Sequence, residues 1–194
     1  CHWAVSMASE VEVVILQHPL EVKQAKGSAR LLHLSLHGSE LHTGELFDAA
    51  VLNKLLHAPG KYSVLLYPEF DEALSHSMIS PEQLDAEMLA SPACLRLIVL
   101  DGTWRKSRKM LYVNPLLQAL PRLSLRNMPE SHYRIRKAHR AGQLSTLEAC
   151  CYALMQLEQD DEKFSPLFAA FDCFIEQQMN LSHRHCAQSA DANT

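Results

Sequence analysis

Residues 95–100 read LRLIVL, an apolar run that only Arg96 interrupts and that ends abruptly at Asp101. A strand with one face in water alternates apolar and polar side chains, whereas a continuous apolar run predicts a strand covered on both faces. Two other runs share this character, EVVIL at residues 12–16 and YSVLLY at residues 62–67, and a proline follows each of them closely. The chain is therefore predicted to be an α/β protein with a mostly parallel sheet flanked by helices.

Helical patterns separate the predicted strands. Apolar spacing predicts helices at residues 21–36, 46–56, 103–111, 145–158 and 166–179, and short ones starting at Ser80 and Asn114. Ser145 is followed three residues later by Glu148, which predicts a capping box at the start of its helix. A further strand is expected at residues 121–125, whereas residues 37–44 have a loop-like composition. From Ser182 onwards we expect a disordered tail.

Composition narrows the class of protein. The 194 residues suffice for one domain with a sizeable core. No apolar run reaches the roughly 18 residues of a membrane helix, and no secretory leader is recognisable, so no membrane partner is expected. The six cysteines form no C-x-x-C pair, which favours reduced thiols and a cytoplasmic location. Because the chain begins at Cys1 rather than at Met, we expect that further residues precede it.

Positive charge is concentrated in one part of the chain. The formal net charge is −4, yet residues 101–140 hold ten Lys or Arg against two acidic residues, a net +8 that leaves −12 elsewhere. Such an asymmetry is typical of a basic face that binds a polyanion such as RNA. The alternative is that these charges only solvate helix and loop surfaces.

The turns after the predicted strands are the expected ligand site, because parallel sheets bind ligands beyond the carboxyl ends of their strands. Three turns qualify, at His18-Pro19, at Tyr67-Pro68 and at residues 101–104, which read DGTW. Asp101 at a rigid strand end is a candidate proton acceptor, and Trp104 is a candidate wall of the site. Asp101 is equally well placed to cap the next helix, with Trp104 filling the core.

Four motifs, in order, carry a resemblance to a known family. They are QHPLE at residues 17–21, LYP at residues 66–68, DGTW at residues 101–104, and YRIRK at residues 133–137 with LSTLEA at residues 144–149. Together they resemble the motifs of the DTW-domain family over about residues 11–160. Four motifs in the same order are far more specific than any one of them.

The resemblance implies a SPOUT-like α/β fold whose C-terminal knot holds S-adenosylmethionine. It implies transfer of the 3-amino-3-carboxypropyl group of that cofactor to N3 of a uridine in tRNA, with release of methylthioadenosine. Residues 11–181 would then form the DTW domain, residues 1–10 the remnant of an N-terminal Cys-containing segment, and residues 182–194 the tail. Two alternatives stay open: a SPOUT-type tRNA methyltransferase and an RNA-binding module without catalysis.

The resemblance also implies roles for particular residues. Catalytic roles fall to Asp101, as the base that accepts the N3 proton, to Trp104 and to Arg105. The expected cofactor-binding residues are Leu66, Tyr67, Pro68, Leu100, Thr103, Leu144, Ser145, Thr146 and Glu148. Glu148 would bind the amine or the ribose of the cofactor, unless the capping box is its whole role. Many family members carry a Cys cluster that looks like a zinc site, of which Cys1 would be the last member.

The basic segment supplies the residues expected to bind tRNA. These are Lys106, Lys109, Arg134, Arg136, Lys137 and Arg140, which would contact phosphates and make binding dependent on salt. Tyr112 and Tyr133 are candidates for stacking on an extruded base, although either side chain could instead be packed.

Overall fold

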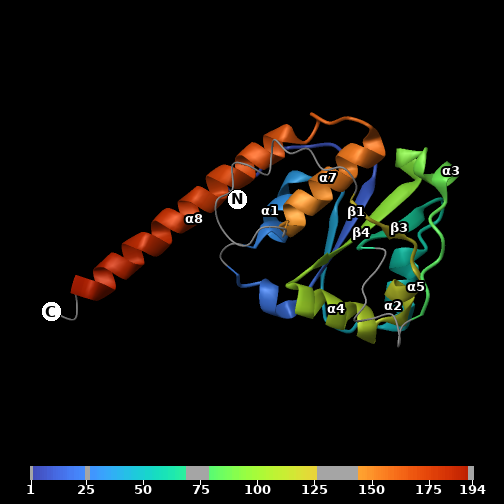
Figure 1. The fold of residues 1–194 in the computed structure, drawn as a ribbon, viewed down its shortest axis with the longest axis horizontal. Coiled ribbons are helices and arrows are strands. Elements are labelled where there is room, and N and C mark those ends of the chain that lie inside the picture. Colours follow the sequence, from blue (N-terminus) through green and yellow to red (C-terminus); the bar gives the residue numbers. More distant parts are fainter. Residues whose placement is uncertain (1, 25–26, 69–78, 126–143, 192–194) are drawn as a thin grey trace.

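A five-stranded parallel sheet organises the chain, as a computed structural model shows for residues 2–24, 27–68, 79–125 and 144–191, with side chains described as far as residue 178 (Figure 1). The strands are β1 (Glu12–Gln17), β2 (Glu40–Thr43), β3 (Tyr62–Leu66), β4 (Leu95–Asp101) and β5 (Arg122–Leu123). Their order across the sheet is β2-β1-β4-β3-β5, and every pairing is parallel. The predicted α/β class with a parallel sheet is therefore confirmed.

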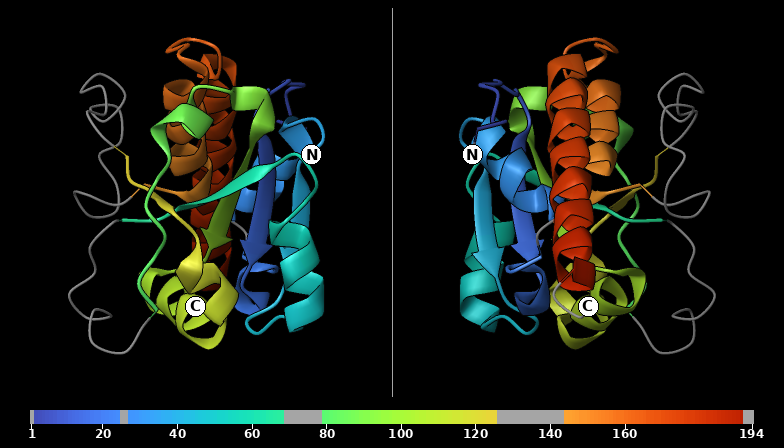
Figure 2. Two further views of the ribbon diagram at one scale, coloured as in Figure 1. Left: turned by 90° about the vertical axis from the view of Figure 1, so that its right-hand side faces the viewer. Right: turned by 90° about the vertical axis from the view of Figure 1, so that its left-hand side faces the viewer.

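Helices cover both faces of this sheet. They are η1 (Pro19–Glu21), α1 (Ser28–Ser35), α2 (Ala49–Leu56), α3 (Ala86–Leu89), η2 (Pro92–Cys94), α4 (Trp104–Val113), α5 (Pro115–Ala119), α7 (Thr146–Glu158) and α8 (Ser165–Asp191). One core cluster joins the sheet to α1, α7 and α8, and a second joins it to α2, α4 and α5. Figure 2 shows α7 and α8 side by side on one side of the molecule, with α8 in red. The result is three layers with the sheet in the middle.

Strand β4 explains the apolar run that dominates the sequence. It lies between β1 and β3, and all seven of its residues are buried. Leu97 and Val99 belong to the core beneath α1, α7 and α8, whereas Ile98 and Leu100 belong to the core beneath α2, α4 and α5. Since successive side chains of a strand point to opposite faces, a strand covered on both faces needs apolar residues at nearly every position.

Arg96, the one charge in that run, lies at the amino end of the sheet. Its guanidinium binds the Glu12 carboxylate at 2.7 Å and donates to the Leu55 carbonyl oxygen at 2.7 Å. Lys61 binds the other oxygen of Glu12 at 2.8 Å. Partial burial of Glu12 opposes its charged form, but the hydrogen bonds from Lys61 and Arg96 outweigh that effect and lower the pKa of the carboxyl group. A fully paired network can therefore hold a charged residue in an otherwise apolar strand.

Several predicted elements have different bounds in the structure. The helix expected from residue 21 begins at Ser28: η1 ends at Glu21, and Gly27 stands at the N-cap position of α1. The loop expected at residues 37–44 was wrong over β2, an edge strand whose ELHT side chains are half-buried or exposed and so lack an apolar run. The helix expected at Ser80 begins instead after Asp85, whose carboxylate caps α3.

The C-terminal part of the chain holds two of the longer helices. The capping box at Ser145 and Glu148 is confirmed at the start of α7. Helix α8 continues through Asp191, whereas we expected order to be lost from Ser182; residues 182–191 contain neither glycine nor proline, so nothing local ends the helix. Among the described residues, no helix combines the length and apolarity required to span a membrane. The expected knot depends on residues 126–143, which lie outside the described part.

Candidate functional site

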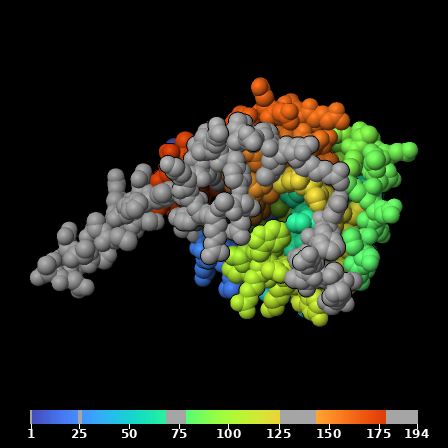
Figure 3. All heavy atoms as spheres, viewed as in Figure 1, coloured from blue at the N-terminus to red at the C-terminus, as the bar shows by residue number. Residues whose placement is uncertain are grey.

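A cavity of about 370 Å³ opens at the carboxyl ends of β3, β4 and β5, where α4 and α7 begin. Its volume falls within the range of small-molecule sites. In Figure 3 it is the hollow between the yellow-green α4 and the orange helices above it. Strand ends and helix starts therefore meet where parallel sheets bind their ligands.

Eight of the nine residues expected to bind the cofactor line this cavity. They are Leu66, Tyr67, Pro68, Leu100, Thr103, Leu144, Ser145 and Thr146. The ninth, Glu148, does not line the cavity, and its carboxylate accepts the Ser145 amide at 2.8 Å within the capping box. The residues come from segments up to eighty positions apart in the chain, so their convergence is a property of the fold rather than of any one motif.

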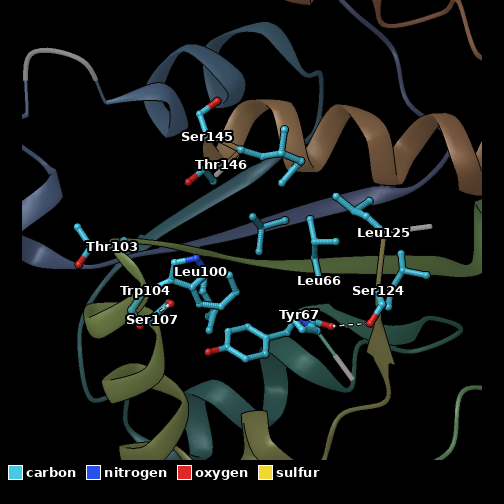
Figure 4. Close-up of a pocket in the computed structure, with 16 residues that line it drawn as sticks. Leu66, Tyr67, Leu100, Thr103, Trp104, Ser107, Ser124, Leu125, Ser145 and Thr146 are labelled. Carbon is cyan, nitrogen blue, oxygen red and sulfur yellow. Dashed lines mark hydrogen bonds between the residues drawn. The ribbon is translucent and has the colours of Figure 1, made fainter. Parts of the chain in front are cut away.

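Seven further residues line the cavity and were not predicted from the sequence: Val99, Gly102, Ser107, Leu123, Ser124, Leu125 and Ala149. Ser124 and Leu125 follow β5 directly, and the Tyr67 carbonyl oxygen accepts the Ser124 hydroxyl at 3.5 Å (Figure 4). The strand expected at residues 121–125 would have nominated this turn had the strand ended at Leu123. Ser107 was detectable as the residue one helical turn after Trp104 on the same side.

Two aromatic rings form one wall of the cavity. Tyr67 is buried and meets Trp104 edge to face, with ring centroids 5.5 Å apart and an interplanar angle of 78°. The Arg122 guanidinium lies over the Tyr67 ring at 5.5 Å from its centroid. Figure 4 shows Tyr67 and Trp104 directed toward one another beneath Leu100. Trp104 is 44% exposed, so the same ring borders both the cavity and the outer surface.

Asp101 is buried beside the cavity and does not line it. One of its carboxylate oxygens accepts the Thr146 hydroxyl at 2.6 Å, and the other accepts the Gln17 side-chain amide at 2.9 Å. Its carbonyl oxygen accepts the His18 amide at 2.9 Å. Asp101 thus joins the ends of β1 and β4 to the start of α7, and Thr146 stands between its carboxylate and the cavity.

The His18 imidazole holds the turn after β1 in place. Its Nδ1 accepts the Leu20 amide at 3.1 Å, so Nε2 bears the proton and donates to Glu45 at 2.9 Å. Lys109 binds the second oxygen of Glu45 at 2.8 Å. Hydrogen bonds from Lys109 and His18 lower the pKa of the Glu45 carboxyl group. The His-Pro motif is therefore a structural link between β1 and α4 in the described residues.

The two helices that begin at the cavity differ at their N-termini. In α7 the Leu147 amide donates to the Ser28 hydroxyl and the Glu148 amide donates to the Ser145 hydroxyl, both at 3.3 Å. In α4 the Thr103 side chain makes no cap hydrogen bond. Amide groups at a helix start attract anions when no side chain satisfies them. The start of α4 is thus the better place for a carboxylate.

The cations expected to bind RNA, together with Arg105, which was expected to be catalytic, are placed in three ways. Lys106 binds Glu21 at 2.6 Å and Lys109 binds Glu45, so both ammonium groups already have an anionic partner. Arg105 is exposed on α4, outside the cavity lining. Arg134, Arg136, Lys137 and Arg140 lie outside the described residues, as do Tyr133 and Cys1.

No metal centre is formed by the residues that the structure describes. Within them, no three His, Cys, Asp or Glu side chains are grouped so that they could hold a metal ion. Cys150 and Cys151 are buried in α7, and burial raises the pKa of both thiols, which keeps them protonated. The described residues do not fit a zinc site, and no step of a reaction is assigned to zinc.

Comparison with known proteins identifies the family of the chain. The DTW domain family model matches residues 1–179. A curated protein of Drosophila melanogaster named tRNA-uridine aminocarboxypropyltransferase 2 is 32% identical over 157 residues, which cover 78% of this chain and 58% of that protein. One of Macaca fascicularis with the same name is 28% identical over 152 residues, which cover 76% of this chain and 48% of that protein. The chain spans about half the length of these relatives. No solved structure matches.

Proposed function

Because the chain belongs to the DTW-domain family, we propose that it transfers the 3-amino-3-carboxypropyl group of S-adenosylmethionine to N3 of a uridine in tRNA. Methylthioadenosine is the second product. The names of the two relatives support this activity. The observation that carries the proposal is one cavity in which three motif-bearing segments converge, those after β3, after β4 and before α7; the motif after β1 does not line it. A tRNA methyltransferase and a non-catalytic RNA-binding module remain the alternatives that the test below must exclude.

The cavity fits such a donor in its chemistry. Apolar side chains, among them Leu66, Leu100 and Leu123, supply walls for a flat heterocycle. The aromatic pair of Tyr67 and Trp104 supplies ring surfaces that favour a nearby cation such as a sulfonium. The uncapped start of α4 is the place we propose for the carboxylate of the transferred group, with Arg105 beside it.

When bound, the donor supplies an electrophilic carbon next to a sulfonium, and the protein has to orient it and accept a proton. We propose that Trp104 covers one side of that centre and leaves the aminocarboxypropyl arm open to the mouth of the cavity. Because the Thr146 hydroxyl donates its hydrogen to Asp101, its lone pairs remain available as an acceptor in the cavity. We assign the N3 proton of uridine to this acceptor: as Thr146 accepts it, Thr146 passes its own hydroxyl proton to Asp101, whose carboxylate becomes neutral.

We also propose the SPOUT-like knot that the family resemblance implies. Strand β5 lies at one edge of the sheet, whereas α7 packs on β3, β4 and α1 nearer its centre. The chain therefore returns from the edge to the middle of the sheet between Leu123 and Thr146. Leu144, Ser145 and Thr146 line the same cavity as the turns after β3 and β4, which supports this proposal.

The test is product analysis. The protein is incubated with S-adenosylmethionine and tRNA, and nucleosides and small molecules are identified by mass spectrometry. We expect 3-(3-amino-3-carboxypropyl)uridine and methylthioadenosine in equal amounts. A methylated nucleoside with S-adenosylhomocysteine would identify a methyltransferase instead. Absence of any S-adenosylmethionine binding in calorimetry, with retained tRNA binding, would favour the non-catalytic module.

A further inference from the structure

The outer face of α4 combines aromatic and cationic side chains, which we call the α4 face. Its members are Trp104, Arg105, Arg108, Lys109 and Tyr112. Ser107, Met110 and Leu111 are buried on the side of the helix that faces the protein, and Trp104 lies at the boundary between that side and the α4 face. Resting on the proposed function, we propose that the α4 face binds a single-stranded stretch of the RNA substrate, with Tyr112 as a stacking platform for a base.

The aromatic rings are the first evidence for this surface. Tyr112 is 56% exposed and Trp104 is 44% exposed, although both are large side chains that a helix normally turns toward its core. Eight residues of helix separate them by about 12 Å along the axis, on one side of the helix. Unpaired RNA bases stack on exposed aromatic rings of this kind, whatever their identity, because every base has a π-face.

The charge of the helix is the second evidence. Helix α4 reads WRKSRKMLYV and contains four cations and no acidic residue. Lys106 and Lys109 bind Glu21 and Glu45, so part of this charge is already neutralised within the protein. Arg105 is exposed and makes no ion pair with a described residue, which leaves its guanidinium for a phosphate. Arg105 lies between Trp104 and Tyr112 in the sequence, an order that suits an RNA strand, in which phosphates and bases alternate.

Continuity with the cavity is the third evidence. Trp104 lines the cavity and also begins the α4 face, so the two sites share one side chain. Figure 3 shows the yellow-green α4 along the rim of the hollow. An RNA strand that lies along α4 with one base stacked on Tyr112 would therefore bring a neighbouring nucleotide to the mouth of the cavity.

The composition of the face favours RNA over a protein partner. The core of a protein interface is more apolar than its rim and is depleted of charged residues, lysine among them. On α4 the aliphatic Met110 and Leu111 are fully buried in the protein, and the exposed positions carry rings or positive charge. Rings interleaved with cations match the single-stranded nucleic acid surface instead.

Tyr112 is the residue that tests the proposal, because it lies outside the cavity lining. The variants are Tyr112→Ala, which removes the ring, and Tyr112→Trp, which keeps a stacking surface. The matched control for Arg105→Ala is Lys54→Ala on α2. Lys54 is also an exposed cation, but its helix carries no aromatic side chain. Affinity for the tRNA substrate is measured by fluorescence anisotropy at several salt concentrations, and S-adenosylmethionine binding by calorimetry.

We expect Tyr112→Ala to weaken RNA binding roughly fivefold to a hundredfold, with Tyr112→Trp near wild type and cofactor binding unchanged. Arg105→Ala should lower the slope of log affinity against log salt by about one, and Lys54→Ala should not. Unchanged RNA affinity in Tyr112→Ala would overturn the inference even if the transferase activity is found. Conversely, Tyr112→Ala could lose RNA affinity while the wild-type protein forms no aminocarboxypropyl product. That result would uphold the RNA surface and refute the proposed function.

Discussion

The two ends of the sheet use buried polar groups in different ways. At the amino end, Arg96 and Lys61 bind Glu12, and the Arg96 guanidinium also donates to a carbonyl oxygen, so charges of opposite sign satisfy one another. At the carboxyl end, Asp101 accepts hydrogen bonds from the neutral groups of Gln17 and Thr146, and no described cation forms an ion pair with it.

The difference distinguishes a structural charge network from the catalytic site that we propose. A paired charge network has no capacity left for a ligand, and no cavity residue belongs to it. The Asp101 carboxylate is held only by neutral donors among the described residues, and it is the group to which we assign the proton of the substrate. Substitutions at the amino end should therefore affect stability, and those at the carboxyl end should affect turnover.

The largest effect is expected for Asp101→Ala. Loss of the carboxylate removes the proposed proton acceptor and should lower turnover by about a hundredfold or more. The side chains of Gln17 and Thr146 also lose their acceptor, so stability should fall by about 1–3 kcal/mol. Turnover is measured as modified nucleoside formed per unit time, with folding checked by circular dichroism. Wild-type turnover in this variant would show that Asp101 has no catalytic role.

Next is Arg96→Met, which tests the amino end. The change leaves Glu12 without one of its cations and the Leu55 carbonyl oxygen without its donor, so we expect a loss of about 2 kcal/mol in the free energy of unfolding. Urea denaturation measures this loss. Turnover below the unfolding transition should match wild type; a specific loss of turnover would break the division between the two ends.

Thr146→Val should have a smaller effect on turnover, about tenfold, because it keeps the shape of the side chain and removes only the hydroxyl between Asp101 and the cavity. Thr146→Ser, which restores the hydroxyl, is the control and should recover most of the activity. If Thr146→Val is as active as wild type, Asp101 does not act through Thr146, and the carboxylate itself must reach the substrate.

The smallest effect concerns pH. Because the pKa of Glu12 is lowered in the folded protein, its stabilising contribution is present above its ordinary value of 4.5 and is lost as pH falls through the folded value. The carboxylate is partly exposed, so this contribution should stay below about 1 kcal/mol. Glu12→Gln should accordingly reduce the difference in unfolding free energy between neutral and acidic pH. An unaltered difference would show that the network is not responsible.

The local parts of the fold were predictable from the sequence. Strand β4 follows from its continuous apolar run, and the start of α7 follows from the capping box of Ser145 and Glu148. Both signals depend on residues close together in the chain. Strand β2 was missed because an edge strand needs no apolar run. The start of α1 was missed because the apolar spacing already begins at Val22, ahead of Gly27 at the N-cap position.

The location of the site was predictable from the sequence, but its hydrogen bonds and ion pairs were not. Strand-end turns and motifs nominated most of the cavity lining, because parallel strands bring their carboxyl ends to one edge whatever their order. The partners of Asp101, by contrast, are 84 and 45 positions away in the chain, and no local pattern links them. The ion pairs of Lys106 with Glu21 and of Lys109 with Glu45 were likewise not predictable. From the sequence, both lysines were identified only as cations.

The sequence by itself therefore determined the α/β class, the strands buried on both faces and the position of the cavity at the carboxyl ends of the strands. Only the tertiary structure decided that Asp101 is bound by Gln17 and Thr146, and that Trp104 and Tyr112 are left exposed on α4. The physical reason is that secondary structure follows from short-range periodicity, whereas burial and hydrogen-bond partners depend on which distant segments pack together.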